Sequence, residues 1–167
     1  AILSWLDQQI HRLGSFGPTN WNHRSIVEIP AVQKSQGWFL HAMTGREWLV
    51  RLVFRVARNT FRQAELSSRL ALPSVHSIDG MDAFGETQRV QVANRRGPWQ
   101  EVAVLAHKLS DVDTPAFRSF LAEAVKAFEL NLARMRTRPE DVMPWKLLGE
   151  KWHLSEKGFP PGQRVRW

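Results

Sequence analysis

The sequence feature that most constrains the fold is a run of alternating side chains around residue 50. Apolar residues occupy every second position: Trp48, Val50, Leu52, Phe54 and Val56. Successive side chains of a β-strand point to opposite faces, so these five share one face, and Arg51 and Arg55 share the other. An apolar face of this length must be covered by a second layer. The run therefore predicts a central strand of a sheet and not a lone surface hairpin.

Strand patterns of the same kind recur in pairs. Residues 37–44 precede the central strand and are joined to it by Thr44-Gly45-Arg46, a short connection typical of antiparallel hairpins. Residues 88–94 and 99–108 form a second hairpin, and residues 25–29 form a short strand that a proline ends. The sequence thus predicts an antiparallel sheet of about five strands.

Helices are predicted where apolar residues follow helical spacing. One covers residues 2–13, and a short one covers residues 61–70 after Thr60, a favourable N-cap. The longest follows Thr114 as its N-cap and carries an uninterrupted apolar stripe over residues 117–132. Strands flanked by helices, without strand–helix–strand alternation, predict an α+β fold. In this fold the sheet packs against the N-terminal helix and the long C-terminal helix.

The apolar pattern ends beyond the long helix. Residues 137–167 hold four prolines and three glycines, which leave no room for another long helix. Residues 134–167 carry eight basic and four acidic side chains, which is +4 of the total net charge of +7. We therefore expect an α+β domain over residues 1–136 and an extended basic tail or linker over residues 137–167. Because the chain begins at Ala1 and not at methionine, we interpret it as an excised domain or a processed chain.

The net charge and the absence of cysteine favour some classes of partner and exclude some kinds of site. A formal net charge of +7 and a pI of about 10.8 favour partners that carry phosphates or other anions. The chain has no cysteine, which excludes disulfides, thiolate zinc sites and cysteine nucleophiles and favours a cytoplasmic setting. No run approaches the roughly 20 apolar residues that a membrane-spanning helix needs. We expect no membrane partner.

The sequence lacks the motifs that would indicate catalysis or metal binding. The six histidines have no ligand spacing, and no Gly-x-Ser-x-Gly, Ser-x-x-Lys or P-loop pattern occurs. We therefore expect no catalytic residue, no metal and no cofactor. One enzyme hypothesis stays open, in which His41 and His107 act together as cross-strand neighbours on one face of the sheet.

Basic residues interleaved with tryptophan give the clearest functional signal. Arginine and lysine neutralise phosphates, while indole rings stack on bases. The nucleic-acid-binding candidates are Arg58, Arg62, Arg95 and Arg96 in the domain, and Lys151, Trp152, Lys157, Arg164, Arg166 and Trp167 in the tail. The alternative is that the tail tryptophans dock the tail onto the domain, onto a neighbouring domain or onto a second copy.

Three segments resemble regions of known proteins. Residues 145–162, 97–102 and 113–117 resemble extra C-terminal regions of bacterial relatives of the excinuclease ABC A subunit. The Walker A loop, the ABC signature and the cysteine zinc modules of that subunit have no counterpart in this sequence. The resemblance therefore implies an accessory module in a DNA-repair or DNA-binding context, with no ATPase residue. The order of helix, sheet and helix is also similar to the compact YjbR-type and frataxin-like folds, the first of which is associated with DNA binding.

These observations lead to one leading hypothesis and one alternative. The leading hypothesis is a non-catalytic accessory module that binds nucleic acid, DNA more than RNA, mainly through backbone phosphates. The alternative is a protein–protein or interdomain module with an aromatic docking tail.

Overall fold

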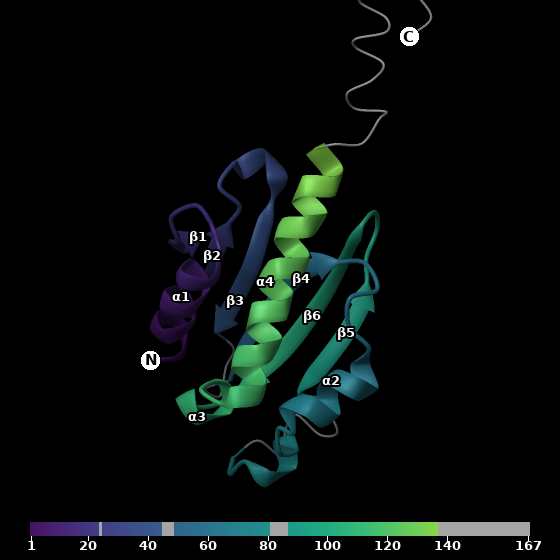
Figure 1. The fold of residues 1–167 in the computed structure, drawn as a ribbon. Coiled ribbons are helices and arrows are strands. Elements are labelled where there is room, and N and C mark those ends of the chain that lie inside the picture. Colours follow the sequence, from purple (N-terminus) through teal and green to yellow (C-terminus); the bar gives the residue numbers. More distant parts are fainter. Residues whose placement is uncertain (24, 45–48, 81–86, 137–167) are drawn as a thin grey trace, which may run out of the picture. The chain divides into compact units, whose positions relative to one another are not determined.

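The computed structural model describes residues 1–23, 25–44, 49–80 and 87–136. Figure 1 shows the elements of this part of the chain. In chain order they are α1 (Ile2–Leu13), β1 (Asn20–His23), β2 (Ile26–Pro30), η1 (Lys34–Gln36), β3 (Trp38–Thr44), β4 (Val50–Ala57), α2 (Gln63–Leu70), η3 (Val75–Ser77), β5 (Val90–Asn94), β6 (Trp99–Ala106), α3 (Leu109–Val112) and α4 (Pro115–Arg136).

The described strands form one six-stranded sheet in the order β1-β2-β3-β4-β6-β5. Every neighbouring pair is antiparallel, and β4 lies between β3 and β6, as its alternating sequence predicts. The α+β prediction, with an N-terminal helix and a long C-terminal helix, is confirmed (Figure 1). The sequence analysis missed β1, because its sequence Asn-Trp-Asn-His has no apolar alternation.

Aromatic side chains join α4 to the sheet. Phe54 of β4 is fully buried, and its ring centroid lies 6.2 Å from that of Phe117 and 5.3 Å from that of Phe120. Farther along the helix, the ring centroid of Phe128 lies 5.3 Å from that of Phe39 on β3. Burying each such side chain contributes about 1.5–3 kcal/mol. The apolar stripe of α4 therefore packs against the alternating strands, as the sequence predicts.

The two predicted helix caps have different outcomes. The Thr114 hydroxyl accepts a hydrogen bond from the Phe117 backbone N–H at 3.1 Å, which confirms Thr114 as the cap of α4. The Thr60 hydroxyl instead donates to the Ala57 carbonyl at 2.6 Å, and α2 begins only at Gln63. The Thr60 prediction is wrong because this residue lies in the turn that closes back on the end of β4.

Strand register divides the sheet residues between two faces. Phe54 and its cross-strand partner Val102 face α4, and we call this side the helix face. Arg55 and its partner Glu101 face the opposite side, because neighbouring residues of a strand alternate. We call this opposite side the open face. Its described residues include Glu28, Trp38, His41, Arg51, Val53, Arg55, Glu101 and Ala103.

Candidate nucleic-acid interface

Three of the four arginines predicted in the domain lie at one end of the sheet, where β5 turns into β6. Gly97 in this turn has a φ of 77°, a left-handed conformation that glycine adopts without strain. The Arg58 backbone N–H donates to the Pro98 carbonyl at 2.9 Å. Nη1 of Arg58 donates to the carbonyl oxygens of Arg95 (2.6 Å) and Gly97 (3.4 Å). These bonds fix the end of β4 against the turn, so Arg58, Arg95 and Arg96 belong to one surface, the hairpin end.

Of the three hairpin-end arginines, only Arg95 forms an ion pair with a described carboxylate. Nε of Arg95 lies 3.2 Å from Oε1 of Glu101, and about half of the Arg95 side chain is exposed. Arg58 donates to carbonyl oxygens, which do not neutralise its charge. Arg96 is exposed and has no hydrogen-bond or ion-pair partner within the described residues. Exposed ion pairs contribute about 0–1 kcal/mol, so Arg95 can exchange Glu101 for a phosphate at little cost.

The other predicted residues are not part of the hairpin end. Arg62 precedes α2, and its Nη1 lies 3.7 Å from Oε1 of Glu65 in a pair of exposed side chains. Within the described ranges, no hydrogen bond or ion pair joins Arg62 to the three hairpin-end arginines. The tail candidates lie outside the described residues: Lys151, Trp152, Lys157, Arg164, Arg166 and Trp167.

The open face holds an arginine that the sequence analysis did not select as a site residue. Cζ of Arg55 lies 5.0 Å from the ring centroid of Trp38 and 4.8 Å from that of Trp99. Cation–π contacts of this kind stabilise by about 0.5–2 kcal/mol. Nε of Arg55 is buried and has no hydrogen-bond partner among the described residues. Burial lowers the pKa of Arg55, and the nearby Glu101 carboxylate acts in the opposite direction.

Planar side chains continue across the open face from Arg55. The ring of Trp38 stacks on the ring of His41, with centroids 3.6 Å apart and planes 12° from parallel. Nε2 of His41 in turn lies 2.6 Å from Oε2 of Glu28 on β2. The result is a row of contacting side chains from β2 to β6, which we call the aromatic row: Glu28, His41, Trp38, Arg55 and Trp99. Trp99 is 7% exposed, and its ring centroid also lies 5.6 Å from that of Phe128 on α4, so this end of the row belongs to the core.

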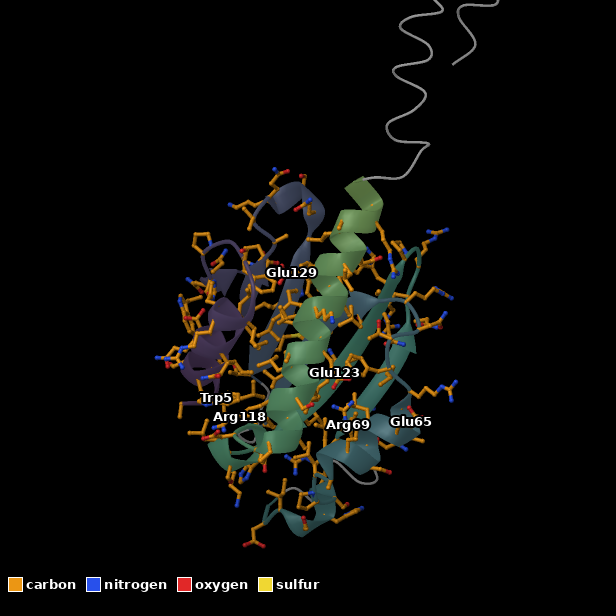
Figure 2. The ribbon with its side chains drawn as sticks, in the orientation of Figure 1. Trp5, Glu65, Arg69, Arg118, Glu123 and Glu129 are labelled. Carbon is orange, nitrogen blue, oxygen red and sulfur yellow. The ribbon has the colours of Figure 1, made fainter. Side chains whose placement is uncertain are left out.

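Arginines in the helix layer form ion pairs with carboxylates. Figure 2 shows Arg69 of α2 beside Glu123 of α4, with which it forms an ion pair. Arg118 pairs with Asp113 and lies 6.0 Å from the ring centroid of Trp5, which packs α1 against α4 (Figure 2). These two arginines therefore connect helices and have carboxylate partners. At the hairpin end, by contrast, Arg58 and Arg96 have no carboxylate partner among the described residues.

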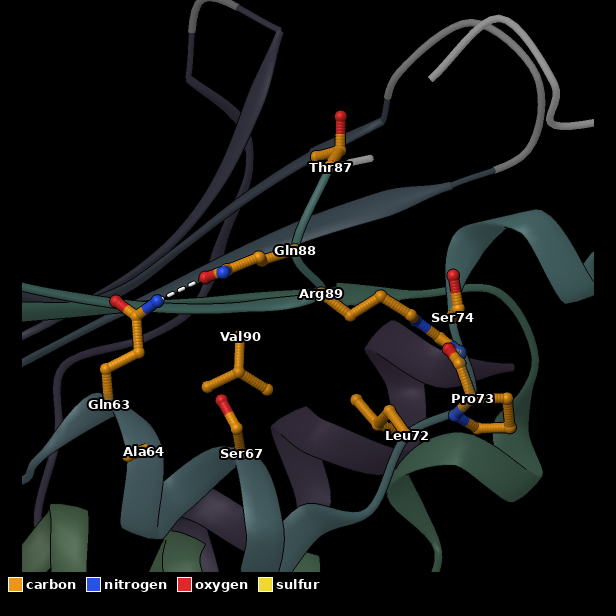
Figure 3. A pocket seen from close by; sticks show the side chains of 10 residues that line it. All are labelled: Gln63, Ala64, Ser67, Leu72, Pro73, Ser74, Thr87, Gln88, Arg89 and Val90. Atoms are coloured by element: carbon orange, nitrogen blue, oxygen red, sulfur yellow. Dashed lines mark hydrogen bonds between the residues drawn. The ribbon is translucent and has the colours of Figure 1, made fainter. Parts of the chain in front are cut away.

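A hollow of about 640 Å³ lies between α2 and the start of β5 (Figure 3). The Gln63 amide crosses it and donates to Oε1 of Gln88. Arg89 also lines the hollow, but its guanidinium is already bound to the carbonyls of Leu105 (3.0 Å) and Pro73 (3.1 Å). The remaining lining side chains are neutral. The described residues that line the hollow therefore include no paired acid and base for proton transfer.

Arg89 instead forms a buried ion pair with Asp111, near the end of β6 that is opposite to the hairpin end. Oδ2 of Asp111 accepts hydrogen bonds from Nη2 of Arg89 (2.7 Å) and from the backbone N–H groups of His107 (2.8 Å) and Lys108 (3.2 Å). Burial by itself raises the pKa of Asp111, but these hydrogen bonds outweigh it, so the pKa lies below the usual value. This pair has a structural role.

The histidine hypothesis is wrong in its geometry. His41 on β3 pairs with Glu28 and Val53, whereas His107 follows β6, and β4 lies between these two strands. The two histidines are therefore not cross-strand neighbours. No group of three or more histidine and carboxylate side chains that could hold a metal ion occurs in the described ranges.

Comparisons with known proteins give no further assignment. No family model, no curated protein and no solved structure matches this chain. In the part of the chain that the structure describes, no helix is long and apolar enough to cross a membrane.

Proposed function

We propose that this chain is a non-catalytic module that binds nucleic acid through backbone phosphates at the hairpin end. The observation that carries this proposal is the gathering of Arg58, Arg95 and Arg96 at one end of the sheet, where Glu101 is the one carboxylate among the described residues that pairs with any of them. Guanidinium groups bind phosphate through paired N–H donors. The net charge of +7 supports the same partner class.

The preference for DNA and the repair context rest on the sequence resemblance alone. Segments 97–102 and 113–117 resemble the accessory regions of excinuclease ABC A relatives. The first segment includes the second half of the β5–β6 turn and the start of β6. DNA is therefore the first partner to test, with RNA as the comparison.

The test is a fluorescence-anisotropy titration with labelled DNA, duplex and single strand, at about 50 mM and about 200 mM salt. Each phosphate contact that is lost reduces the slope of log K against log salt by about 1. The double variant R95Q/R96Q should therefore bind more weakly, with a slope smaller by about 2. The matched control is R12Q/K126Q, which removes the same two charges from exposed positions on α1 and α4.

Two results would end the proposal. One is that the wild-type protein does not bind either DNA at the lower salt. The other is that R12Q/K126Q weakens binding as much as R95Q/R96Q, because binding would then depend on overall charge and not on the hairpin end.

A second candidate function, self-association, is favoured by two exposed leucines. Leu13 of α1 is 43% exposed and Leu130 of α4 is 49% exposed, and both line one shallow groove. A second copy of the chain would cover these leucines, in line with the protein–protein alternative. Sedimentation of the wild type and of L13E/L130E tests this candidate, which predicts a dimer that the variant dissociates. A chain without residues 137–167 shows whether the tail contributes to the same association.

A further inference from the structure

The outer edge of β5 presents backbone groups that the described sheet leaves unpaired. Within that sheet β5 is an edge strand and pairs with β6 alone. The Leu105 N–H donates to the Arg89 carbonyl at 2.9 Å, which fixes the hydrogen-bonding phase of the pair. In an antiparallel pair, residues that bond to the partner strand alternate with residues that do not. The N–H and carbonyl groups of Val90 and Val92 therefore point away from β6.

A side-chain amide occupies one point of this outer edge. Oε1 of Gln63 accepts a hydrogen bond from the Val92 N–H at 3.0 Å. Nε2 of the same amide donates to Oε1 of Gln88, on the other side of Val90 in the sequence (Figure 3). A carboxamide has the acceptor and donor groups of a peptide bond. The contacts of Gln63 thus indicate the chemistry that fits this edge, which is the amide of an extended backbone.

The backbone of Val90 lies at the hollow between α2 and β5. Within the described ranges, no hydrogen bond to its outward N–H or carbonyl is present, although Val90 is only 4% exposed. Buried backbone groups without a partner are rare in native structures. Val90 lines the hollow together with Gln63 and Ser67 of α2 (Figure 3). The volume of about 640 Å³ lies in the range of ligand sites, about 300–1,000 Å³.

The hollow is held in place at one end, and its described lining has no unmatched charge. The Arg89 guanidinium donates to the carbonyls of Leu105 and Pro73, which fixes the start of β5. Nη2 of Arg89 lies 2.7 Å from Oδ2 of Asp111, so its charge is matched. The other lining side chains are neutral. A site fixed in advance loses little conformational entropy on binding, and a neutral lining favours an uncharged ligand.

We propose that the outer edge of β5 binds an extended, uncharged segment of a partner protein by strand addition. The backbone of this segment pairs with Val90 and Val92, and its side chains enter the hollow beside α2. In this mode of recognition main-chain hydrogen bonds give affinity, and pockets for alternate side chains give specificity. The incoming backbone displaces the Gln63 amide. The site lies toward the start of β5, whereas the hairpin end follows its last residue, so it does not depend on nucleic-acid binding.

The experiment titrates the isotopically labelled full chain with an end-capped peptide of alternating threonine and valine, which favour extended strands. The control peptide has the same sequence with N-methyl groups on its three central residues, which removes their hydrogen-bond donors. We expect the amide signals of residues 88–92 to shift. The wild type should bind the unmodified peptide about tenfold more tightly than the control, which is the scale of one or two hydrogen bonds.

Two variants change the edge in opposite directions. Q63A removes the competing amide and should bind the unmodified peptide about threefold to tenfold more tightly. V90P removes the outward N–H, which proline allows on an edge strand, and should weaken binding about tenfold. The matched control for Q63A is Q8A, because Gln8 is an exposed glutamine on α1, and its affinity should equal that of the wild type. Thermal unfolding establishes that each variant is folded, and Q63A with the two peptides suffices if V90P is not.

The outcomes decide the proposal without involving the hairpin end. Tighter binding of the unmodified peptide, increased in Q63A and unchanged in Q8A, supports it. Equal affinity for the two peptides, or no shift at residues 88–92, overturns it. A concentration-dependent dimer whose β5 amides shift without peptide would assign the edge to a second copy and would also overturn it. Binding of DNA by the wild type, Q63A and V90P should be the same, because the hairpin-end arginines are unchanged in all three.

Discussion

The two faces of the sheet are built from different chemistry. On the helix face, Phe39, Phe54, Phe117, Phe120 and Phe128 are at most 1% exposed and contact one another. On the open face, Glu28, His41, Trp38 and Arg55 form one row, and its last member, Trp99, is 7% exposed and also contacts Phe128 of α4.

The two faces therefore contribute differently to the stability of the fold. An apolar cluster fully accounts for the helix face, since burial of the phenylalanines drives folding. In the aromatic row, Nε of Arg55 is buried without a hydrogen-bond partner among the described residues, so burial there is less favourable than on the helix face. Substitutions on the two faces should therefore change the free energy of unfolding by different amounts.

The largest expected effect is on the helix face. The Phe120 ring contacts those of Phe54, Phe61 and Phe117, and F120A should lower the free energy of unfolding by about 3–5 kcal/mol. W38A on the open face should cost less than half of that, because Trp38 is partly exposed. Urea denaturation of both variants measures the difference. Equal losses would mean that the open face is part of the folding core.

The second-largest loss of stability should follow from breaking the buried ion pair between Arg89 and Asp111. R89M leaves Asp111 buried without its arginine and should cost about 3 kcal/mol. The pKa of Asp111 is lowered in the folded state, so its contribution is present above the unfolded value near 3.8 and is lost as the pH falls through the folded pKa. D111N should therefore flatten the acid limb of the stability curve. An unchanged acid limb would show that other carboxylates govern it.

The next smaller effect on stability should come from the buried side-chain amide of Gln100. Gln100 is 3% exposed, accepts a hydrogen bond from the Phe61 N–H at 2.9 Å and donates to the Phe61 carbonyl at 3.1 Å. Q100L leaves both backbone groups unpaired and should cost about 1–3 kcal/mol. Hydrogen exchange at the Phe61 amide provides the local measurement, and unchanged protection there would contradict the assignment.

Much of the fold can be predicted from the sequence. Residues 50–56 alternate because one face is buried, and the α4 stripe repeats at helical spacing, so both elements are identified from local pattern. The aromatic row could not be found in this way. Trp38, Arg55 and Trp99 are far apart in sequence and meet only because β4 lies between β3 and β6. The alternation placed Arg51 and Arg55 on one face, but nothing local indicated the indoles beside Arg55.

The smallest expected effect concerns α1. His11 Nδ1 lies 2.9 Å from the Asp7 carbonyl, and Nε2 lies 3.1 Å from the Gly17 carbonyl, so both ring nitrogens face acceptors. Partial burial lowers the pKa of His11, but the bonds to Asp7 and Gly17 outweigh it and raise the pKa above 6.5. Its stabilising contribution is therefore full below pH 6.5 and lost as the pH rises through the folded pKa.

Because His11 is exposed, H11Q should change stability by no more than about 0.5 kcal/mol. The difference in stability between H11Q and the wild type should be seen at about pH 5.5, where the imidazole is protonated. It should vanish at about pH 8.5, where the imidazole is neutral. Thermal unfolding at these two pH values measures it. An effect of equal size at both values would show that the His11 charge is not involved.

The most direct test of the account is a nuclear magnetic resonance titration with single-stranded DNA. The eight tryptophans each give an indole N–H signal, and Trp-to-Phe variants assign them. The account predicts shifts at the amides of residues 95–97 of the hairpin end, with the Trp5 indole on the helix side unchanged. Shifts confined to Trp5 and the α1 and α4 amides, or no shifts at low salt, would contradict it.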